Sequence, residues 1–157
     1  MKAFFAALCL TLLSPVFATP AKDLNKTVKV KMETNYGDIV LELNQEKAPI
    51  TVRNFLKYTD NKFYEGTIFH RVINNFMIQG GGLTADMQKK ATLSEIKNEA
   101  DNGLKNQNGT IAMARTGAVD SATSQFFINV KDNNFLNHKG KSQRDYGYTV
   151  LEKSQRE

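Results

Sequence analysis

FHRVINNFMIQGGG, residues 69–82, is the stretch that decides the fold of this 157-residue chain. Apolar residues dominate on both sides of its two adjacent asparagines, a pair that tolerates turn geometry, so it predicts a hairpin with strands at residues 67–73 and 76–79. Arg71 is charged at any working pH, and it donates hydrogen bonds without acting as a general base. The stretch therefore predicts a site that holds an apolar group beside a carbonyl by electrostatics and not by proton transfer.

The residues before this stretch predict a second hairpin and one helix. Apolar and polar side chains alternate in residues 26–33 and 38–43, and Asn-Tyr-Gly at 35–37 supplies a turn between them. Apolar residues at helical spacing then predict a helix at residues 51–59, with Thr51 capping its first turn.

The residues after the stretch predict a long loop and two further strands. Residues 82–109 are polar and rich in glycine and asparagine, which is typical of a surface loop, with a short helical turn at 94–96. Residues 110–114 and 125–130 are apolar and predict strands. Many short strands with an occasional helix predict a mainly β fold, most simply a closed or nearly closed antiparallel barrel.

Two long motifs resemble one known family. The stretch at residues 69–82 resembles the central signature of the cyclophilin-type peptidyl-prolyl cis-trans isomerases. GTIAMART at 109–116 and DSATSQFFINV at 120–130 resemble the second wall of the same groove. The resemblance runs over residues 28–150 and points most closely to bacterial periplasmic members. It implies a cyclophilin-like antiparallel β-barrel with flanking helices, which accelerates rotation about prolyl peptide bonds without a cofactor.

The resemblance also implies roles for individual residues. Arg71 would donate a hydrogen bond to the imide nitrogen as the amide twists, and Phe76 and Gln79 would complete the catalytic set. The substrate-binding residues would be His70, Met77, Ala114, Arg115, Thr116, Gln125, Phe127, Phe135, Leu136 and Tyr148.

Strand periodicity separates pocket residues from core residues in the two central motifs. The period of two places Met77 and Gln79 on one face, and likewise Gln125 and Phe127. The plain alternative is that these apolar residues only fill a core. On the opposite face, a core role is the prediction for residues 126 and 128.

Other chemistries are weakly supported by the sequence. His70 with Ser121 or Ser124 could start a hydrolase triad, but no acid has helpful spacing. With two histidines and a single cysteine, a metal site built from these ligands is not expected. The glycines at 80–82 lack the ending of a phosphate-binding loop, so they are interpreted as turn glycines.

The sequence departs from the family pattern at several positions. Phe135 and Tyr148 stand where many members have tryptophan and histidine, and the missing indole N–H argues against tight cyclosporin binding. Arg115 replaces a small polar residue, which we expect to alter peptide preference.

The largest departure is at the end of the chain. LEKSQRE follows Val150, so the C-terminal helix and closing strand of the family are expected to be missing. This leaves open a catalytically weak peptide-binding or chaperone-like remnant, or an unstable truncation product.

The N-terminus predicts a secretory signal peptide at residues 1–18, followed by the cyclophilin-like domain at 19–157. Lys2 precedes an apolar run at 4–13 and short residues before a cleavage site after Ala18. A buried N-terminal helix is the alternative. Cleavage would remove Cys9, leave an exported protein without cysteine, and place it in the periplasm.

Composition limits the partners. The net charge of +5 comes from scattered lysines, whereas nucleic-acid binding calls for a basic stripe with stacking aromatics. The apolar N-terminal run is too short for stable membrane insertion. The expected partners are unfolded or exported polypeptides that contain proline, bound by a monomer.

Overall fold

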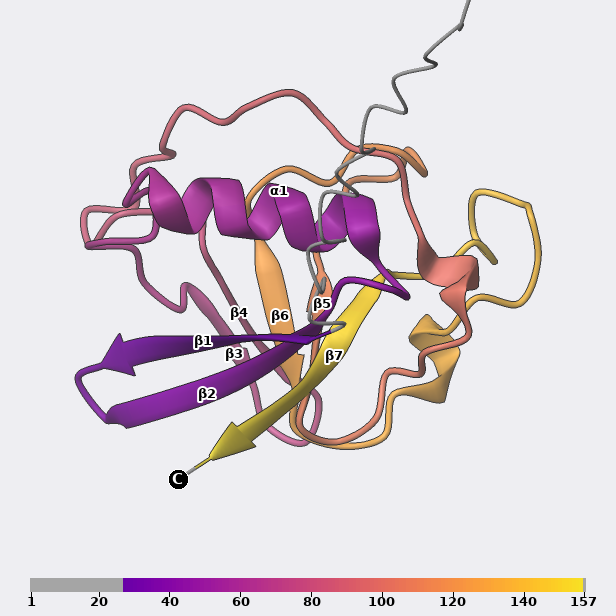
Figure 1. The fold of residues 1–157 in the computed structure, drawn as a ribbon, viewed down its shortest axis with the longest axis horizontal. Coiled ribbons are helices and arrows are strands. Elements are labelled where there is room, and N and C mark those ends of the chain that lie inside the picture. Colours follow the sequence, from indigo (N-terminus) through magenta and orange to yellow (C-terminus); the bar gives the residue numbers. More distant parts are fainter. Residues whose placement is uncertain (1–26, 157) are drawn as a thin grey trace, which may run out of the picture.

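The computed structural model describes residues 27–156, with side chains described up to residue 152. The predicted signal peptide lies outside the described residues. Figure 1 shows the elements, which in chain order are β1 (Thr27–Thr34), β2 (Gly37–Asn44), α1 (Pro49–Asp60), β3 (Arg71–Ile73), β4 (Met77–Gly80), η1 (Ala100–Asn102), β5 (Thr110–Met113), β6 (Phe126–Asn129), η2 (Asn134–Leu136) and β7 (Val150–Arg156).

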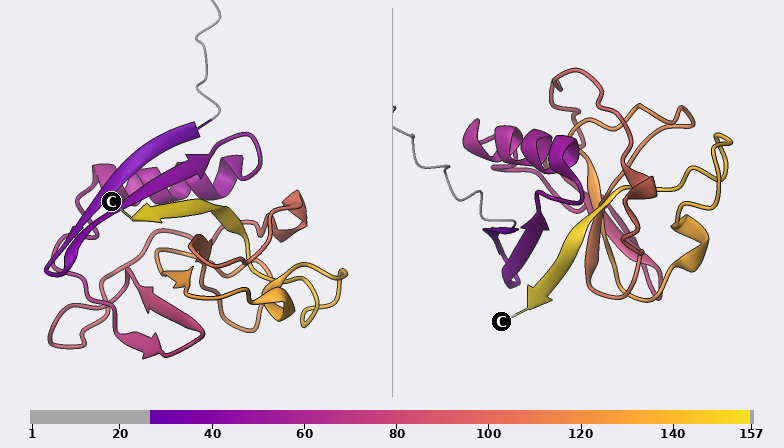
Figure 2. Two further views of the ribbon diagram at one scale, coloured as in Figure 1. Left: turned by 90° about the horizontal axis from the view of Figure 1, so that it is seen from below. Right: turned by 45° about the vertical axis from the view of Figure 1, so that its right-hand side comes forward.

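The strands form one antiparallel sheet of seven strands in the order β1-β2-β7-β5-β6-β4-β3. The prediction of a mainly β, antiparallel fold is therefore confirmed. The sheet curls, and Figure 2 shows the β1–β2 hairpin and the β3–β4 hairpin on the two sides of the opening. Within residues 27–156, β1 and β3 do not pair, so hydrogen bonds do not close the barrel in this part of the chain.

The first hairpin forms as its alternating pattern predicts. All eight residues of β1 pair with β2, from Thr27 opposite Asn44 to Thr34 opposite Gly37. Gly37 adopts a φ of 115°, a conformation that side chains disfavour, so glycine suits this position in the turn.

Helix α1 forms where expected, but its N-terminus differs from the prediction. Thr51 does not cap it, because the helix begins at Pro49 and Thr51 already lies inside the first turn. The carboxylate of Glu99 instead accepts the backbone N–H of Ile50 at 3.1 Å and that of Thr51 at 2.8 Å. It also accepts the Thr51 hydroxyl at 2.7 Å. A residue 48 positions away thus supplies the acceptor that a local cap would provide.

Strand β7 (Val150–Arg156) was not predicted: the final strand was expected to be missing, but β7 pairs with both β2 and β5 in the middle of the sheet. The predictions for β3 to β6 were right in place, with bounds that differ by a few residues. Only Arg71–Ile73 of the predicted 67–73 is paired as a strand, and β4 begins at Met77 because Phe76 belongs to the turn. The predicted helical turn at 94–96 was wrong. Ile96 forms an isolated antiparallel bridge with Ala122, so tertiary pairing overrides the local pattern.

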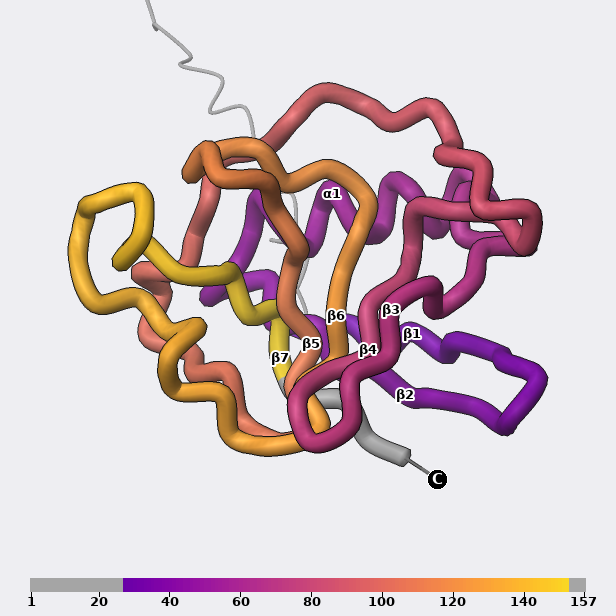
Figure 3. Tube along the Cα trace, turned by 180° about the vertical axis from the view of Figure 1, so that it is seen from behind, coloured from indigo at the N-terminus to yellow at the C-terminus, as the bar shows by residue number. Residues whose placement is uncertain are grey.

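Two apolar clusters lie on opposite faces of the sheet. The larger one is packed between the sheet and α1, and it contains Phe126 and Ile128, whose predicted core role is confirmed. The smaller one is formed by Met77, Ala112, Phe127 and Val150. Figure 3 shows α1 on the far side of β4, β5 and β6. The near side therefore presents the smaller cluster.

Candidate active site

One row of residues crosses five strands on the face that bears the smaller cluster. Arg71 lies opposite Gln79, and Gln79 lies opposite Phe127. Phe127 in turn lies opposite Ala112, and Ala112 opposite Val150. Directly opposed residues of antiparallel strands share a face. The row therefore begins with the cation of Arg71, continues with the amide of Gln79 and ends with buried apolar side chains.

Hydrogen bonds connect the polar members of this site. Arg71 Nη1 donates to Gln79 Oε1 at 3.4 Å, and Gln79 Nε2 donates to Gln125 Oε1 at 2.9 Å. Arg71 is exposed, and the remaining N–H groups of its guanidinium have no hydrogen-bond partner among the described residues. The guanidinium is thus oriented from one side and available on the other.

An apolar pocket adjoins this cation. Met77 and Phe127 are almost fully buried and form the floor. Phe76, Leu136 and Tyr148 pack against the same cluster as partly buried side chains. The structure therefore brings together five residues that were predicted for catalysis or substrate binding, although they come from four separate segments.

Aromatic contacts fix the rim of the pocket. The rings of Phe76 and Phe135 stack at 5.6 Å with an interplanar angle of 26°. Tyr148 meets Phe127 edge to face at 5.7 Å. Phe135 has 62% of its surface exposed, which leaves it free to extend the rim toward a ligand.

The glycines at 80–82 combine a turn with close packing. Gly81 has a φ of 80°, as the turn interpretation requires. A Cβ on Gly82 would lie 2.5 Å from Gln125 Cγ. Gly82 therefore leaves the room that the Gln125 side chain occupies, a role that the sequence did not reveal.

The Arg115 side chain makes many contacts within the protein. Its Nε donates to the carbonyl of Gly147 at 2.9 Å, and its guanidinium lies 4.8 Å from the centre of the Tyr148 ring. Its remaining donors reach the carbonyls of residues 116, 117, 118 and 143. The side chain thus ties together the loops at this end of the groove. Ala114 packs against the pocket cluster, while Thr116 bonds to Ser121.

The residues of a possible hydrolase triad are not assembled. The Ser121 hydroxyl bonds within its own loop, to Thr116 and Ala118. Ser124 Oγ and His70 Nδ1 are both buried without a hydrogen-bond partner in the described part of the chain, so they do not bond to each other. In residues 27–156 no group of three or more histidine, cysteine or acidic residues is placed to hold a metal ion.

Sequence reasoning missed one residue next to the pocket. Asn133 is fully buried, and its Nδ2 donates to the backbone carbonyl of Phe76 at 2.8 Å. A single asparagine in a polar loop has no periodic or spacing signal, so only the tertiary structure reveals this contact.

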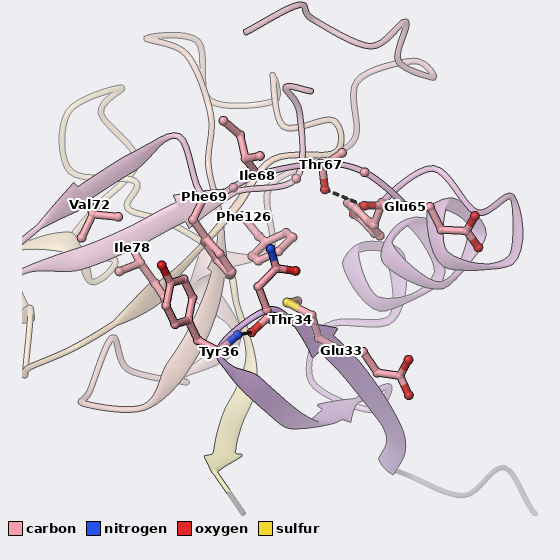
Figure 4. A pocket seen from close by; sticks show the side chains of 16 residues that line it. Glu33, Thr34, Tyr36, Glu65, Thr67, Ile68, Phe69, Val72, Ile78 and Phe126 are labelled. Atoms are coloured by element: carbon pink, nitrogen blue, oxygen red, sulfur yellow. Dashed lines mark hydrogen bonds between the residues drawn. The ribbon is translucent and has the colours of Figure 1, made fainter. Parts of the chain in front are cut away.

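A second hollow lies on the other face of the same strands. It has a volume of about 620 Å³, and Figure 4 shows Tyr36 and Thr34 of the β1–β2 hairpin facing Phe69, Val72 and Ile78 across it. Val72 and Ile78 alternate with Arg71 and Gln79 along their strands, so they point to the opposite side. The hollow is therefore separate from the candidate active site and lies between the unpaired ends of the sheet.

Comparison with known proteins decides the family. Residues 29–153 match the family described as cyclophilin type peptidyl-prolyl cis-trans isomerase/CLD. The chain belongs to the cyclophilin family. Relatives at high identity carry the same enzyme name, and the chain is a peptidyl-prolyl cis-trans isomerase of the cyclophilin type.

The cyclophilin relatives include several bacterial proteins. Peptidyl-prolyl cis-trans isomerase cyp18 of Streptomyces antibioticus is 63% identical over 122 residues, which are 78% of this chain and 74% of that protein. Peptidyl-prolyl cis-trans isomerase A of Dickeya dadantii is 53% identical over 153 residues, 98% of this chain and 76% of that protein. Isomerase B of Escherichia coli K12 is 61% identical over 78% of this chain and 74% of its own length.

A solved cyclophilin has the same fold. The crystal structure of a cyclophilin-type isomerase from Cryptosporidium parvum matches with a TM-score of 0.67 at 28% identity, covering 82% of this chain and 78% of that one. Separately, the described residues contain no helix of the length and hydrophobicity needed to span a membrane.

Proposed function

We propose that this cyclophilin isomerises prolyl bonds at the groove formed by Arg71, Gln79 and the apolar pocket, and that its substrates are exported polypeptides folding in the periplasm. The observation that supports the site is the row that places Arg71, Gln79 and Phe127 side by side across three strands. A prolyl substrate presents a carbonyl and an apolar ring as neighbours, which is the pair of groups that this row can hold.

The chemistry requires binding and no covalent step. Amide resonance opposes rotation with a barrier of roughly 18–20 kcal/mol. An enzyme lowers the barrier by binding the twisted amide more tightly than either planar form, and each ~1.4 kcal/mol of that preference is worth about tenfold in rate. The site must therefore hold the ring still and stabilise the charge that twisting creates.

Arg71 supplies the stabilising donor in this proposal. When the C–N bond twists, the imide nitrogen recovers its lone pair and becomes a hydrogen-bond acceptor. The free side of the Arg71 guanidinium donates to that nitrogen, while its bond to Gln79 keeps the group in place. A guanidinium has no acceptor, so Arg71 acts as a hydrogen-bond donor and not as a base.

The pocket holds the proline ring against rotation. Met77 and Phe127 form its floor, and Phe76, Leu136 and Tyr148 its walls. The Gln125 amide and the backbone near Ala114 lie at the edge of the pocket, where the substrate chain would pass. Arg115 acts here through the loops that it holds, and so sets the shape of this end of the groove.

Export is supported by the N-terminal sequence. Lys2, the apolar run at 4–13 and the short residues before Ala18 form the pattern of a cleavable signal. The test is to express the full chain in a Gram-negative host, separate the periplasm and measure the mass of the protein there. A start at Thr19 supports export, whereas an uncleaved protein in the cytoplasm contradicts it.

The catalytic proposal is tested with the cis-to-trans rate of a short prolyl peptide. Residues 19–157 should accelerate the exchange, and Arg71→Ala should remove most of the acceleration while peptide binding, measured by calorimetry, changes little. Arg71→Lys serves as the matched control that keeps the charge but loses the planar fork. Binding without acceleration by the parent protein would favour a peptide-binding role over isomerisation.

A further inference from the structure

Three asparagines are buried beside the candidate pocket, where the proposed mechanism does not use them. Asn106 and Asn133 have no exposed surface, and Asn129 has 1%. They come from three segments: the loop before β5, the end of β6 and the turn that leads into η2. Buried amides are retained only where hydrogen bonds compensate the loss of water, so this cluster requires an explanation.

Their side chains are connected in series. Asn133 Nδ2 donates to Asn129 Oδ1 at 2.7 Å. Asn129 Nδ2 donates to Asn106 Oδ1 at 3.1 Å and to the hydroxyl of Thr110 at 2.9 Å. The backbone adds a further link, because the N–H of Asn133 donates to the carbonyl of Asn106 at 2.8 Å.

Both ends of the series reach the backbone of residues that form the pocket rim. At one end, Asn133 Nδ2 donates to the Phe76 carbonyl at 2.8 Å. At the other end, Asn106 Nδ2 donates to the Leu136 carbonyl at 3.3 Å. The same Leu136 carbonyl accepts the N–H of Tyr148 at 3.1 Å, so a third rim residue is attached.

The orientation of the Asn133 amide is forced. A flipped amide would place its oxygen against the Phe76 carbonyl and Asn129 Oδ1, both of which are acceptors. In the orientation observed, Asn133 Oδ1 has no hydrogen-bond partner among the described residues. A buried acceptor without a partner destabilises the fold, so the two donated bonds are kept at a cost.

We infer that Asn106, Asn129 and Asn133 form a positioning chain that fixes the spacing between Phe76 and Leu136, and thereby the width of the pocket for the proline ring. The inference rests on the proposed site. A connected network of buried amides admits one arrangement, because every alternative leaves several groups unpaired. Apolar side chains of the same volume make no directional bonds, so the segments that bear Phe76 and Leu136 could shift relative to each other and the rim would lose its fixed geometry.

The test compares Asn133→Ala with Asn54→Ala. Asn54 is also a buried asparagine, and its side chain donates to the backbone carbonyl of Thr123. It lies on α1 and is not one of the three connected asparagines. In Asn133→Ala the rim loosens, and we expect kcat/KM to fall about tenfold, mainly through a higher KM, because the pocket binds ground and transition states alike. Asn54→Ala should leave KM within about twofold of the parent value.

A second measurement tests the position of the rim without any substrate turnover. The nuclear Overhauser contact between the rings of Phe76 and Phe135 reports the rim directly in protein without substrate. It should weaken in Asn133→Ala and persist in Asn54→Ala. If the parent protein had no isomerase activity, the proposed function of the site would be wrong. The ring contact would still test whether the three asparagines hold the rim in place.

One result overturns the inference. It is a folded Asn133→Ala protein with an unchanged ring contact and an unchanged KM. If that variant does not fold, Asn133→Ser is measured instead, since a hydroxyl has a single proton and cannot donate to both the Phe76 carbonyl and Asn129 Oδ1 as the amide does. An intermediate loss of the contact supports the positioning role, and no loss contradicts it.

Discussion

Gln79 and Gln125 meet side chain to side chain, with Gln79 Nε2 donating to Gln125 Oε1 at 2.9 Å. This bond determines which way the Gln79 amide points, because only its nitrogen can donate to an oxygen. The side-chain oxygen of Gln79 is thereby turned toward Arg71, and it accepts a hydrogen bond from Arg71 Nη1. A residue of β4 and one just before β6 thus orient the cation of β3.

We predict that Gln125→Leu lowers kcat/KM about tenfold, because Gln79 loses its orienting acceptor and Arg71 its fixed position. The measurement is the isomerisation rate of a prolyl peptide over a range of substrate concentrations. Gln107→Leu, at an exposed glutamine outside the groove, is the control. Full activity in Gln125→Leu would show that Arg71 is held by other contacts.

Gly82→Ala should impair the site without a change in any polar residue. Its Cβ would lie 2.5 Å from Gln125 Cγ and 2.7 Å from Gln125 Nε2, so the Gln125 side chain must shift from the position in which it accepts from Gln79. We expect a loss of kcat/KM of about the size predicted for Gln125→Leu, measured in the same assay.

The matched control is Gly140→Ala, where the nearest atom to a new Cβ is 3.9 Å away. Activity in this variant should equal that of the parent. If Gly82→Ala and Gly140→Ala behaved alike, the packing of Gln125 against Gly82 would be irrelevant to catalysis.

Glu99→Ala should destabilise the fold through helix α1. Three bonds to Ile50 and Thr51 end on the Glu99 carboxylate, so the change leaves the first turn without its acceptor. We expect the free energy of unfolding in urea to fall by about 1–2 kcal/mol, the usual size of a lost N-terminal cap. Glu95→Ala, at an exposed position four residues earlier, should change it by less than about 0.5 kcal/mol. Equal effects of the two changes would refute the capping role.

Alkaline pH should unfold the protein through Tyr64. Burial raises the pKa of this phenol above its ordinary value of 10.0, and its hydroxyl donates to the Ser124 carbonyl at 3.0 Å. A raised pKa means that the stabilisation is complete below about pH 10, where the unfolded tyrosine is also neutral, and is lost as pH rises further.

The change that tests this is Tyr64→Phe. At pH 7 the variant should be less stable than the parent by about 1 kcal/mol, because it lacks the hydrogen bond. At pH 11 the difference should shrink or reverse, since the variant has no phenol to ionise at this position. Tyr36→Phe, at a fully exposed tyrosine, is the control for the loss of a phenol elsewhere.

Local sequence patterns predicted the elements whose conformation depends mainly on residues close together in the sequence. The β1–β2 hairpin followed from alternation and a glycine turn. The period of two placed Met77 with Gln79 on one strand and Gln125 with Phe127 on another, whereas the packing of Met77 against Phe127 depends on how the two strands pair. The ends of elements were less predictable. The start of α1 depends on Glu99, and Ile96 pairs with Ala122, so both are set by residues distant in sequence.

The sequence by itself determined the family resemblance and the mainly β class and supplied candidate residues for the groove, because long motifs and strand periodicity are properties of neighbouring residues. The tertiary structure alone decided how those residues are held. Sheet register placed Arg71 beside Gln79, close packing against Gly82 positioned Gln125, and Asn133 bonded to the backbone of Phe76 at the pocket rim. The physical reason is that hydrogen-bond partners and steric fit depend on distances in space, which sequence separation does not encode.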